Sequence, residues 1–145
     1  FIVVSPQCPK SDLWWKPKIV AGLIDELIGK HLVDKNRIYL TGLSQGGFGT
    51  WATAAAYPRK FAAVAPICGG GKVEWAKKYG QLPIWNFHGD ADRTVPVKLS
   101  RDLIAAIKKA SGNVKYTEYP GVGHNSWTAT YDNPKLYEWF LSHKR

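Results

Sequence analysis

A serine between two glycines constrains the fold of this chain more than any other sequence feature. Residues 37–40 are β-branched and aromatic and predict a strand, whereas the alanine-rich residues 50–57 predict a helix. Ser44 therefore lies in a turn that joins a strand to a helix, with Gly42 and Gly46 on either side. We expect the turn to strain the backbone of Ser44 and the glycines to avoid collisions. A plain glycine-rich loop is the alternative.

The bulk composition predicts one folded domain, residues 1–145. The chain is 45% hydrophobic and holds seven Trp and seven Tyr, which excludes a disordered protein. No apolar run is long enough to span a membrane, and no signal peptide opens the sequence. We therefore expect a soluble protein, cytoplasmic or secreted, without a membrane partner.

The charge and the cysteine content speak against nucleic-acid, metal and cofactor partners. The net charge is +9, but Lys and Arg are spread along the whole chain without a basic block or a recognised binding motif. A solvated basic surface is therefore favoured over a nucleic-acid site. Two cysteines do not make a disulfide framework, and no Cys/His cluster has metal-ligand spacing, so we expect neither metal nor cofactor.

Hydrophobic periodicity predicts alternating strands and helices. Apolar residues at helical spacing predict a helix from Pro17 to about Val33, and the apolar run 1–4 predicts a strand buried on both faces. The other elements are expected as strands at 37–43, 61–67, 83–87 and 114–119, and as helices after Ser44, from Pro96, at 134–142 and irregularly within 72–80. This alternation implies a parallel sheet with helices on both faces.

A serine exposed on such a turn is a candidate nucleophile. It then needs a base, because its hydroxyl is a poor nucleophile at neutral pH. In a parallel α/β sheet the reactive groups lie at the carboxyl ends of strands. His124 follows the last expected strand directly and is the candidate base. Of the other histidines, His31 and His143 are expected on helices at the surface, and His88 is expected to make a structural hydrogen bond at a strand end.

A carboxylate must hold the histidine in the reactive tautomer. Asp90 and Asp92 both follow the fourth expected strand, and their position alone does not separate them. One of the two is expected to cap the turn instead. The residues by themselves leave the acid open.

Four motifs together carry a resemblance to a known family. They are Gly42-Leu43-Ser44-Gln45-Gly46-Gly47, Ala65-Pro66-Ile67-Cys68-Gly69-Gly70, His88-Gly89-x-x-Asp92-x-x-Val95-Pro96 and Gly123-His124-Asn125-Ser126-Trp127. With them the chain resembles the C-terminal part of an α/β-hydrolase esterase of the dienelactone-hydrolase and predicted-peptidase type, related also to polyhydroxybutyrate-depolymerase-like feruloyl and acetylxylan esterases. The resemblance covers nearly the whole chain and implies the α/β-hydrolase fold.

The resemblance also implies a role for each candidate residue. The family's spacing His-Gly-x-x-Asp selects Asp92 over Asp90 as the acid. Ser44 would be the nucleophile, His124 the base, and the backbone N–H of Gln45 one donor of the oxyanion hole. Dienelactone hydrolase uses a cysteine nucleophile, so its lactone chemistry is not carried over to this chain.

The same resemblance implies that part of the fold is missing. The family's sheet has eight strands, and the five expected here correspond to strands four to eight. The missing part carries the strand-three loop, which donates a second oxyanion-hole amide. We therefore expect that the 145 residues are not a self-sufficient enzyme. A segment upstream of Phe1, another polypeptide or a second copy would complete the sheet.

The function favoured by these features is that of a serine carboxylesterase acting through an acyl-enzyme. Its substrate would be a small-molecule or polysaccharide-linked ester, with feruloyl and acetyl esters as candidates. Two alternatives stay open, a non-catalytic fragment that needs its N-terminal half and a peptidase of the same fold. Trp127 and Trp75, together with Trp14, are candidate residues of an aromatic pocket, and ordinary packing is the alternative for each.

Overall fold

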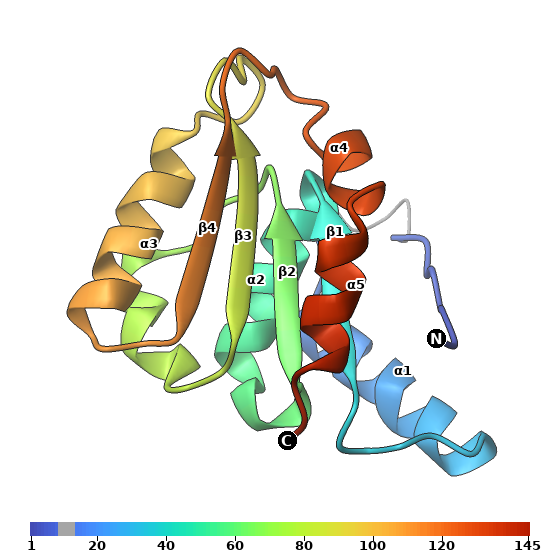
Figure 1. Ribbon diagram of the computed structural model, residues 1–145. Coiled ribbons are helices and arrows are strands. Elements are labelled where there is room, and N and C mark those ends of the chain that lie inside the picture. Colours follow the sequence, from blue (N-terminus) through green and yellow to red (C-terminus); the bar gives the residue numbers. More distant parts are fainter. Residues whose placement is uncertain (9–13) are drawn as a thin grey trace.

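Four parallel strands form the sheet of the computed structural model, which describes residues 1–8 and 14–145. The strands follow one another across the sheet in chain order (Figure 1). They are β1 (Tyr39–Leu43), β2 (Ala63–Ile67), β3 (Ile84–Gly89) and β4 (Val114–Tyr119). The helices within the described residues are α1 (Pro17–Lys30), α2 (Gln45–Ala56), α3 (Lys98–Lys109), α4 (Trp127–Tyr131) and α5 (Pro134–Leu141), with the 3₁₀ segments η1 (Pro58–Lys60) and η2 (Val73–Tyr79).

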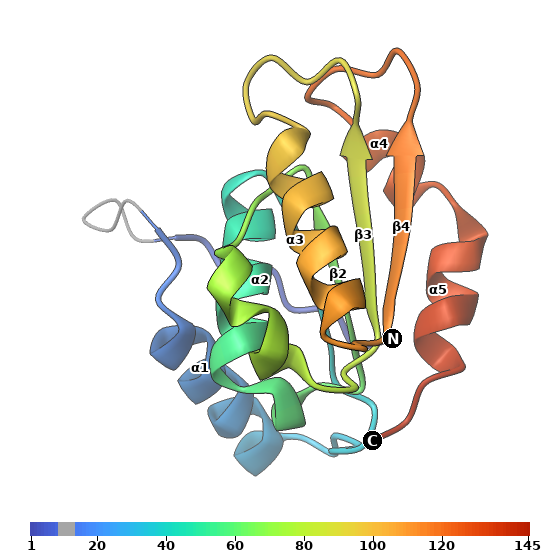
Figure 2. The same ribbon diagram turned by 90° about the vertical axis from the view of Figure 1, so that its left-hand side faces the viewer.

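Helices cover both faces of the sheet. Figure 2 shows α1, α2 and α3 on one side of the strands and α4 and α5 on the other. Strand β2 is buried along its whole length because its side chains pack against the helices on both faces of the sheet. Val64 packs into the cluster with Trp51 and Leu103, whereas Ala65 and Ile67 pack with α5. The predicted parallel α/β sheet with helices on both faces is confirmed.

The predicted strand at the start of the chain is wrong. Residues 1–8 are not assigned to a strand, and the side chains from Phe1 to Val4 are between 47% and 79% exposed. Phe1 contacts the rings of Tyr39 and Tyr137 edge-on, at centroid distances of 5.9 and 6.1 Å. An apolar run becomes a buried strand only when a neighbouring strand pairs with it, and β1 forms its ladder with β2.

The remaining predicted elements are found with small shifts at their ends. Pro17 starts α1, where its missing N–H costs nothing, and Asn133 caps α5 by accepting a hydrogen bond from the Lys135 amide at 3.0 Å. The short helix α4 was not expected. It follows the last strand after only a few residues, and its five positions show no apolar period.

The carboxyl ends of the four strands point to the same edge of the sheet, toward the top of Figure 1. Ser44 follows β1, the loop 90–97 follows β3, and the loop 120–126 follows β4. Segments far apart in the sequence therefore meet at this edge.

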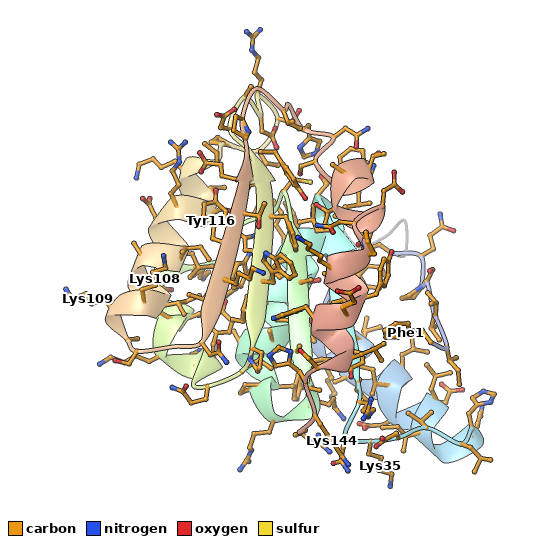
Figure 3. All side chains as sticks on the ribbon, viewed as in Figure 1. Phe1, Lys35, Lys108, Lys109, Tyr116 and Lys144 are labelled. Atoms are coloured by element: carbon orange, nitrogen blue, oxygen red, sulfur yellow. The ribbon has the colours of Figure 1, made fainter. Side chains whose placement is uncertain are left out.

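The positive charge is distributed over the surface. Lys35 and Lys144 lie near one end of the molecule, and Lys108 and Lys109 project from α3 on another side (Figure 3). None of the helices in residues 1–8 and 14–145 is long and apolar enough to cross a membrane.

Candidate active site

Ser44 occupies the strand-to-helix turn in a strained conformation. Its φ and ψ are 50° and −115°, a region that non-glycine residues rarely adopt. Its N–H donates to the Ile67 carbonyl at 3.0 Å and lies 3.3 Å from the sulfur of Cys68, while its carbonyl accepts from the Phe48 amide at 3.0 Å. These bonds tie the turn to the end of β2 and to the first turn of α2.

The glycines around Ser44 do not all serve the same purpose. A Cβ on Gly42 would lie 2.5 Å from the carbonyl oxygen of Gly46, so only glycine fits there. A Cβ on Gly47 would collide with the Ile67 carbonyl. A Cβ on Gly46 itself would meet nothing within 4 Å. The expectation that both flanking glycines must lack a side chain is therefore right for Gly42 and wrong for Gly46. The backbone of Gly46 leaves no room for a Cβ on Gly42, but Gly46 itself has room for one.

A continuous chain of hydrogen bonds links Ser44, His124 and Asp92. The Nε2 atom of His124 lies 2.9 Å from the Ser44 hydroxyl, and its Nδ1 lies 2.7 Å from Oδ2 of Asp92. Because an ionised carboxylate only accepts, Nδ1 carries the hydrogen and Nε2 is left to accept the serine proton. The structure thus brings together residues that are 80 and 32 positions apart in the sequence.

The side chain of Asp92 is fully buried and is held by its own loop. Its Oδ1 accepts the amides of Thr94 and Val95 at 2.8 and 2.9 Å. Burial alone would raise the pKa of Asp92, but the hydrogen bonds from His124 and from these two amides outweigh it and hold the pKa below its ordinary value. The group is therefore ionised at neutral pH, as a partner for an imidazolium must be.

Asp90 has a different place. Its Oδ1 accepts the amide of Gly121 at 2.7 Å, and the contact lies at the exposed surface. It thereby ties the loop after β3 to the loop after β4. The structure places Asp92 and not Asp90 against His124, in agreement with the family spacing.

A second histidine also contacts Asp92. The ring of His88 is fully buried, and its Nε2 lies 3.1 Å from Oδ2 of Asp92 and 2.9 Å from the Val95 carbonyl. Its Nδ1 lies 2.8 Å from the Ser100 hydroxyl. Because the Val95 carbonyl can only accept, Nε2 carries a hydrogen. A structural hydrogen bond at His88 was expected from the sequence, but not that one of its partners is the same carboxylate that holds His124.

Gln45 is the first residue of α2 and follows Ser44 directly. Its backbone N–H lies at the helix N-terminus, where the helix dipole favours a developing negative charge. Gln45 also lines the cavity beside Ser44, and its role as an oxyanion donor stays a prediction.

A cavity of about 470 Å³ opens beside Ser44. Its lining consists of Trp14, Ser44, Gln45, Phe48, Thr94, Val95, Pro96 and Leu99. The sequence did not place Phe48, Thr94, Val95, Pro96 or Leu99 in a binding pocket, because only the fold brings the loop after β3 and the start of α3 next to the serine.

The three candidate tryptophans have three different environments. Trp14 lines the cavity, and its ring meets Phe48 edge-on at 5.1 Å. Trp127 begins α4 and stands edge-on to the His124 ring at 5.5 Å. Trp75 packs instead against the core cluster on the α2–α3 face and lies under the amine of Lys72. The structure therefore does not bring Trp75 to the site.

The described residues hold no group of three or more His, Cys, Asp or Glu side chains that could bind a metal ion. The chemistry that this arrangement can perform is proton transfer between a hydroxyl and an imidazole, backed by a buried carboxylate.

Known proteins share this fold and its sequence pattern. A thermostable esterase of known structure is 41% identical with a TM-score of 0.85, over 88% of this chain and 36% of that one. Poly(3-hydroxyalkanoate) depolymerase C from Paucimonas lemoignei is 48% identical over 48 residues, 33% of this chain and 12% of that protein. Acyl-protein thioesterase 1 from Neurospora crassa is 32% identical over 120 residues, 70% of this chain and 46% of that protein. The chain thus spans less than half the length of each.

The likeness to the esterase structure shows the α/β-hydrolase fold, as the motifs around Ser44, Asp92 and His124 predicted. Residues 17–133 match one family over most of the chain, from the start of α1 to the residue before α5. This protein belongs to the phospholipase/carboxylesterase family.

Proposed function

We propose that this chain carries the catalytic site of a serine hydrolase that cleaves carboxylic esters through an acyl-enzyme. The observation that carries the proposal is the hydrogen-bonded series Ser44–His124–Asp92 at the carboxyl ends of β1, β3 and β4. The relatives support ester chemistry, since they include an esterase, a polyester depolymerase and a thioesterase.

The geometry suggests a role for each group. The Ser44 oxygen attacks the ester carbonyl while Nε2 of His124, 2.9 Å away, takes its proton. The carbonyl oxygen becomes an oxyanion next to the Gln45 amide. His124 then returns the proton to the departing alcohol, which leaves an acyl group on Ser44. Attack by water, activated by the same histidine, releases the acid and restores the serine.

Asp92 acts through His124 in this proposal. The imidazolium that forms when His124 takes the proton lies 2.7 Å from a carboxylate that is already ionised. That carboxylate stabilises the positive charge and keeps Nδ1 protonated.

We further propose that another segment pairs with the outer edge of β1 and supplies a second oxyanion donor. In the sheet of the described residues β1 lies at one edge, and its ladder is with β2. An unpaired edge next to the nucleophile is a template for a further strand. The segment could come from the same protein or from a partner, and ester turnover and oligomeric state of the 145 residues and of a longer natural form would distinguish these cases.

The experiment for the proposed function is a set of variants in the natural full-length protein. Ser44→Ala should abolish both turnover of short-chain aryl esters and labelling by a fluorophosphonate, and His124→Ala should cost about as much turnover. Asp92→Asn should lower kcat by about 10⁴, as tautomer loss does in serine triads, whereas Asp90→Asn should have a small effect. Turnover that survives in Ser44→Ala, or a larger loss at Asp90, would refute the assignment.

A further inference from the structure

We propose that the cavity beside Ser44 binds the acyl part of the ester, and that this acyl group is uncharged, apolar and clearly larger than acetyl. The inference rests on the proposed function and adds to it the side of the substrate and its chemical class. It also assigns a residue outside the cavity, Gly70, as the one that sets the position of the cavity wall.

The cavity lies on the acyl side because the other two directions from the ester carbon are already taken. The carbonyl oxygen must meet the Gln45 amide, and the departing oxygen must meet Nε2 of His124 to receive its proton. The lining includes Ser44 and Gln45 but not His124 or Trp127. The substituent that points into the cavity is therefore the third one, the acyl chain that stays bonded to the serine.

The lining determines the chemistry of that chain. Five of the eight lining residues are apolar, namely Trp14, Phe48, Val95, Pro96 and Leu99, and the other three are uncharged. Trp14 and Phe48 stand edge to face at 64°, which presents both a ring face and a ring edge to a ligand. A carboxylate or ammonium placed there would lose part of its hydration without gaining a partner of opposite charge.

An acetyl group leaves most of this cavity unused. The volume of about 470 Å³ is within the range of small-molecule sites. Each methylene that moves from water into the apolar lining raises kcat/KM by up to about fourfold. Hexanoyl has four methylenes more than acetyl. Because the cavity is open on one side, we expect kcat/KM of the hexanoyl ester to exceed that of the acetyl ester by about tenfold or more, and not by the full fourfold factor for each methylene.

Gly70 stands behind the wall of the cavity. A Cβ added there would lie 3.0 Å from Cδ1 of Leu99 and 3.1 Å from Cε1 of Phe48. Both side chains line the cavity, so they rest on the bare backbone of Gly70. Its φ is not positive, so alanine is compatible with the backbone. A methyl group at this position would push Leu99 or Phe48 toward the substrate and shorten the acyl chain that fits.

The first experiment uses the natural full-length protein and 4-nitrophenyl esters with a constant leaving group. We expect kcat/KM for the hexanoate to exceed that for the acetate by about tenfold or more. The half-ester of adipic acid has the same chain length with a terminal carboxylate, and it should react at least about tenfold more slowly than the hexanoate. The comparison is a strong test, because the net charge of +9 attracts the anionic ester and would by itself predict the opposite order.

The second experiment changes the size of the cavity with substitutions at Gly70 and Leu99. Gly70→Ala should lower the ratio of hexanoate to acetate activity, and Leu99→Ala should raise the ratio of octanoate to butyrate activity. Gly22→Ala is the matched control, since a Cβ on Gly22 in α1 meets nothing within 4 Å, and it should leave both ratios unchanged. Leu99 is 38% exposed, so its truncation keeps the test valid if Gly70→Ala fails to fold.

The outcomes separate the two proposals. A protein that hydrolyses none of the esters and whose Ser44 does not react with a fluorophosphonate would refute the proposed function. A protein that hydrolyses them with equal kcat/KM for acetate and hexanoate, prefers the adipate half-ester, or keeps its ratios in both wall variants would refute the acyl pocket alone.

Discussion

His88 is predicted to act as a positioning residue for Asp92, and this can be tested with two amide variants. The hydrogen on Nε2 of His88 is shared between the Val95 carbonyl and the carboxylate that holds His124. A glutamine side chain can put its N–H at the position of Nε2, whereas an asparagine reaches only as far as Nδ1. His88→Gln therefore keeps the donor to Asp92, and His88→Asn removes it.

The size of the effect follows from the kind of bond that is lost. A hydrogen bond to a charged group contributes about 1.5–3 kcal/mol, which corresponds to about tenfold to a hundredfold in rate if it is lost in the transition state. His88→Asn should therefore lower kcat/KM for an aryl ester by about that factor. His88→Gln should restore most of it.

Measuring kcat below the unfolding transition of each variant distinguishes positioning from a general loss of stability. Where both variants are fully folded, His88→Asn should still lose kcat, whereas His88→Gln should keep most of it. A His88→Asn protein that folds and retains full kcat would refute the reasoning. So would equal losses in both variants.

Two further predictions concern the turn and the sheet edge. Gly42→Ala should lower stability by about 1–3 kcal/mol because its Cβ would lie 2.5 Å from a backbone oxygen, whereas Gly46→Ala should be neutral or stabilising in thermal unfolding. A reversed order would contradict the contact argument. Hydrogen bonds from Arg101 and Tyr116 lower the pKa of Glu118 to about 2. Its contribution to stability is therefore present above its ordinary pKa and is lost as the pH falls toward 2, so Glu118→Gln should lose less stability than the parent between about pH 5 and pH 2. Equal losses would show that these bonds do not stabilise the fold.

The elements that could be predicted from the sequence are those with a local cause. The period of apolar residues in α1 and the continuous apolar run of β2 specify their own type, and their bounds differ by only a few residues from those expected. The strand predicted at Phe1–Val4 is wrong because a strand also needs a neighbouring strand to pair with. Whether such a neighbour is present depends on residues far away in the sequence. The helix α4 was missed because five residues are too few to show a period.

In the site, too, the residues with a local sequence signal could be predicted, and the contacts that depend on the folded loop could not. Ser44 and His124 could be found because each follows a strand within a recognisable motif. Asp90 and Asp92 could be separated only by the family's spacing, and the structure supplies the physical reason: the loop folds back so that its own amides at Thr94 and Val95 point at Asp92. The contact between His88 and Asp92 depends on that same fold-back and has no local signal.

The loop after β3 carries two functions on one short piece of backbone. Thr94 and Val95 hold the carboxylate of Asp92 with their amides, and the same two residues line the cavity beside Ser44. Directed evolution of substrate preference at these positions is therefore expected to trade selectivity against rate, since any backbone shift that reshapes the cavity also moves the carboxylate of Asp92. In the described part of the chain Leu99 and Gly70 supply no hydrogen bond to Asp92, so libraries built on them should alter chain-length preference while the Ser44–His124–Asp92 hydrogen bonds stay in place.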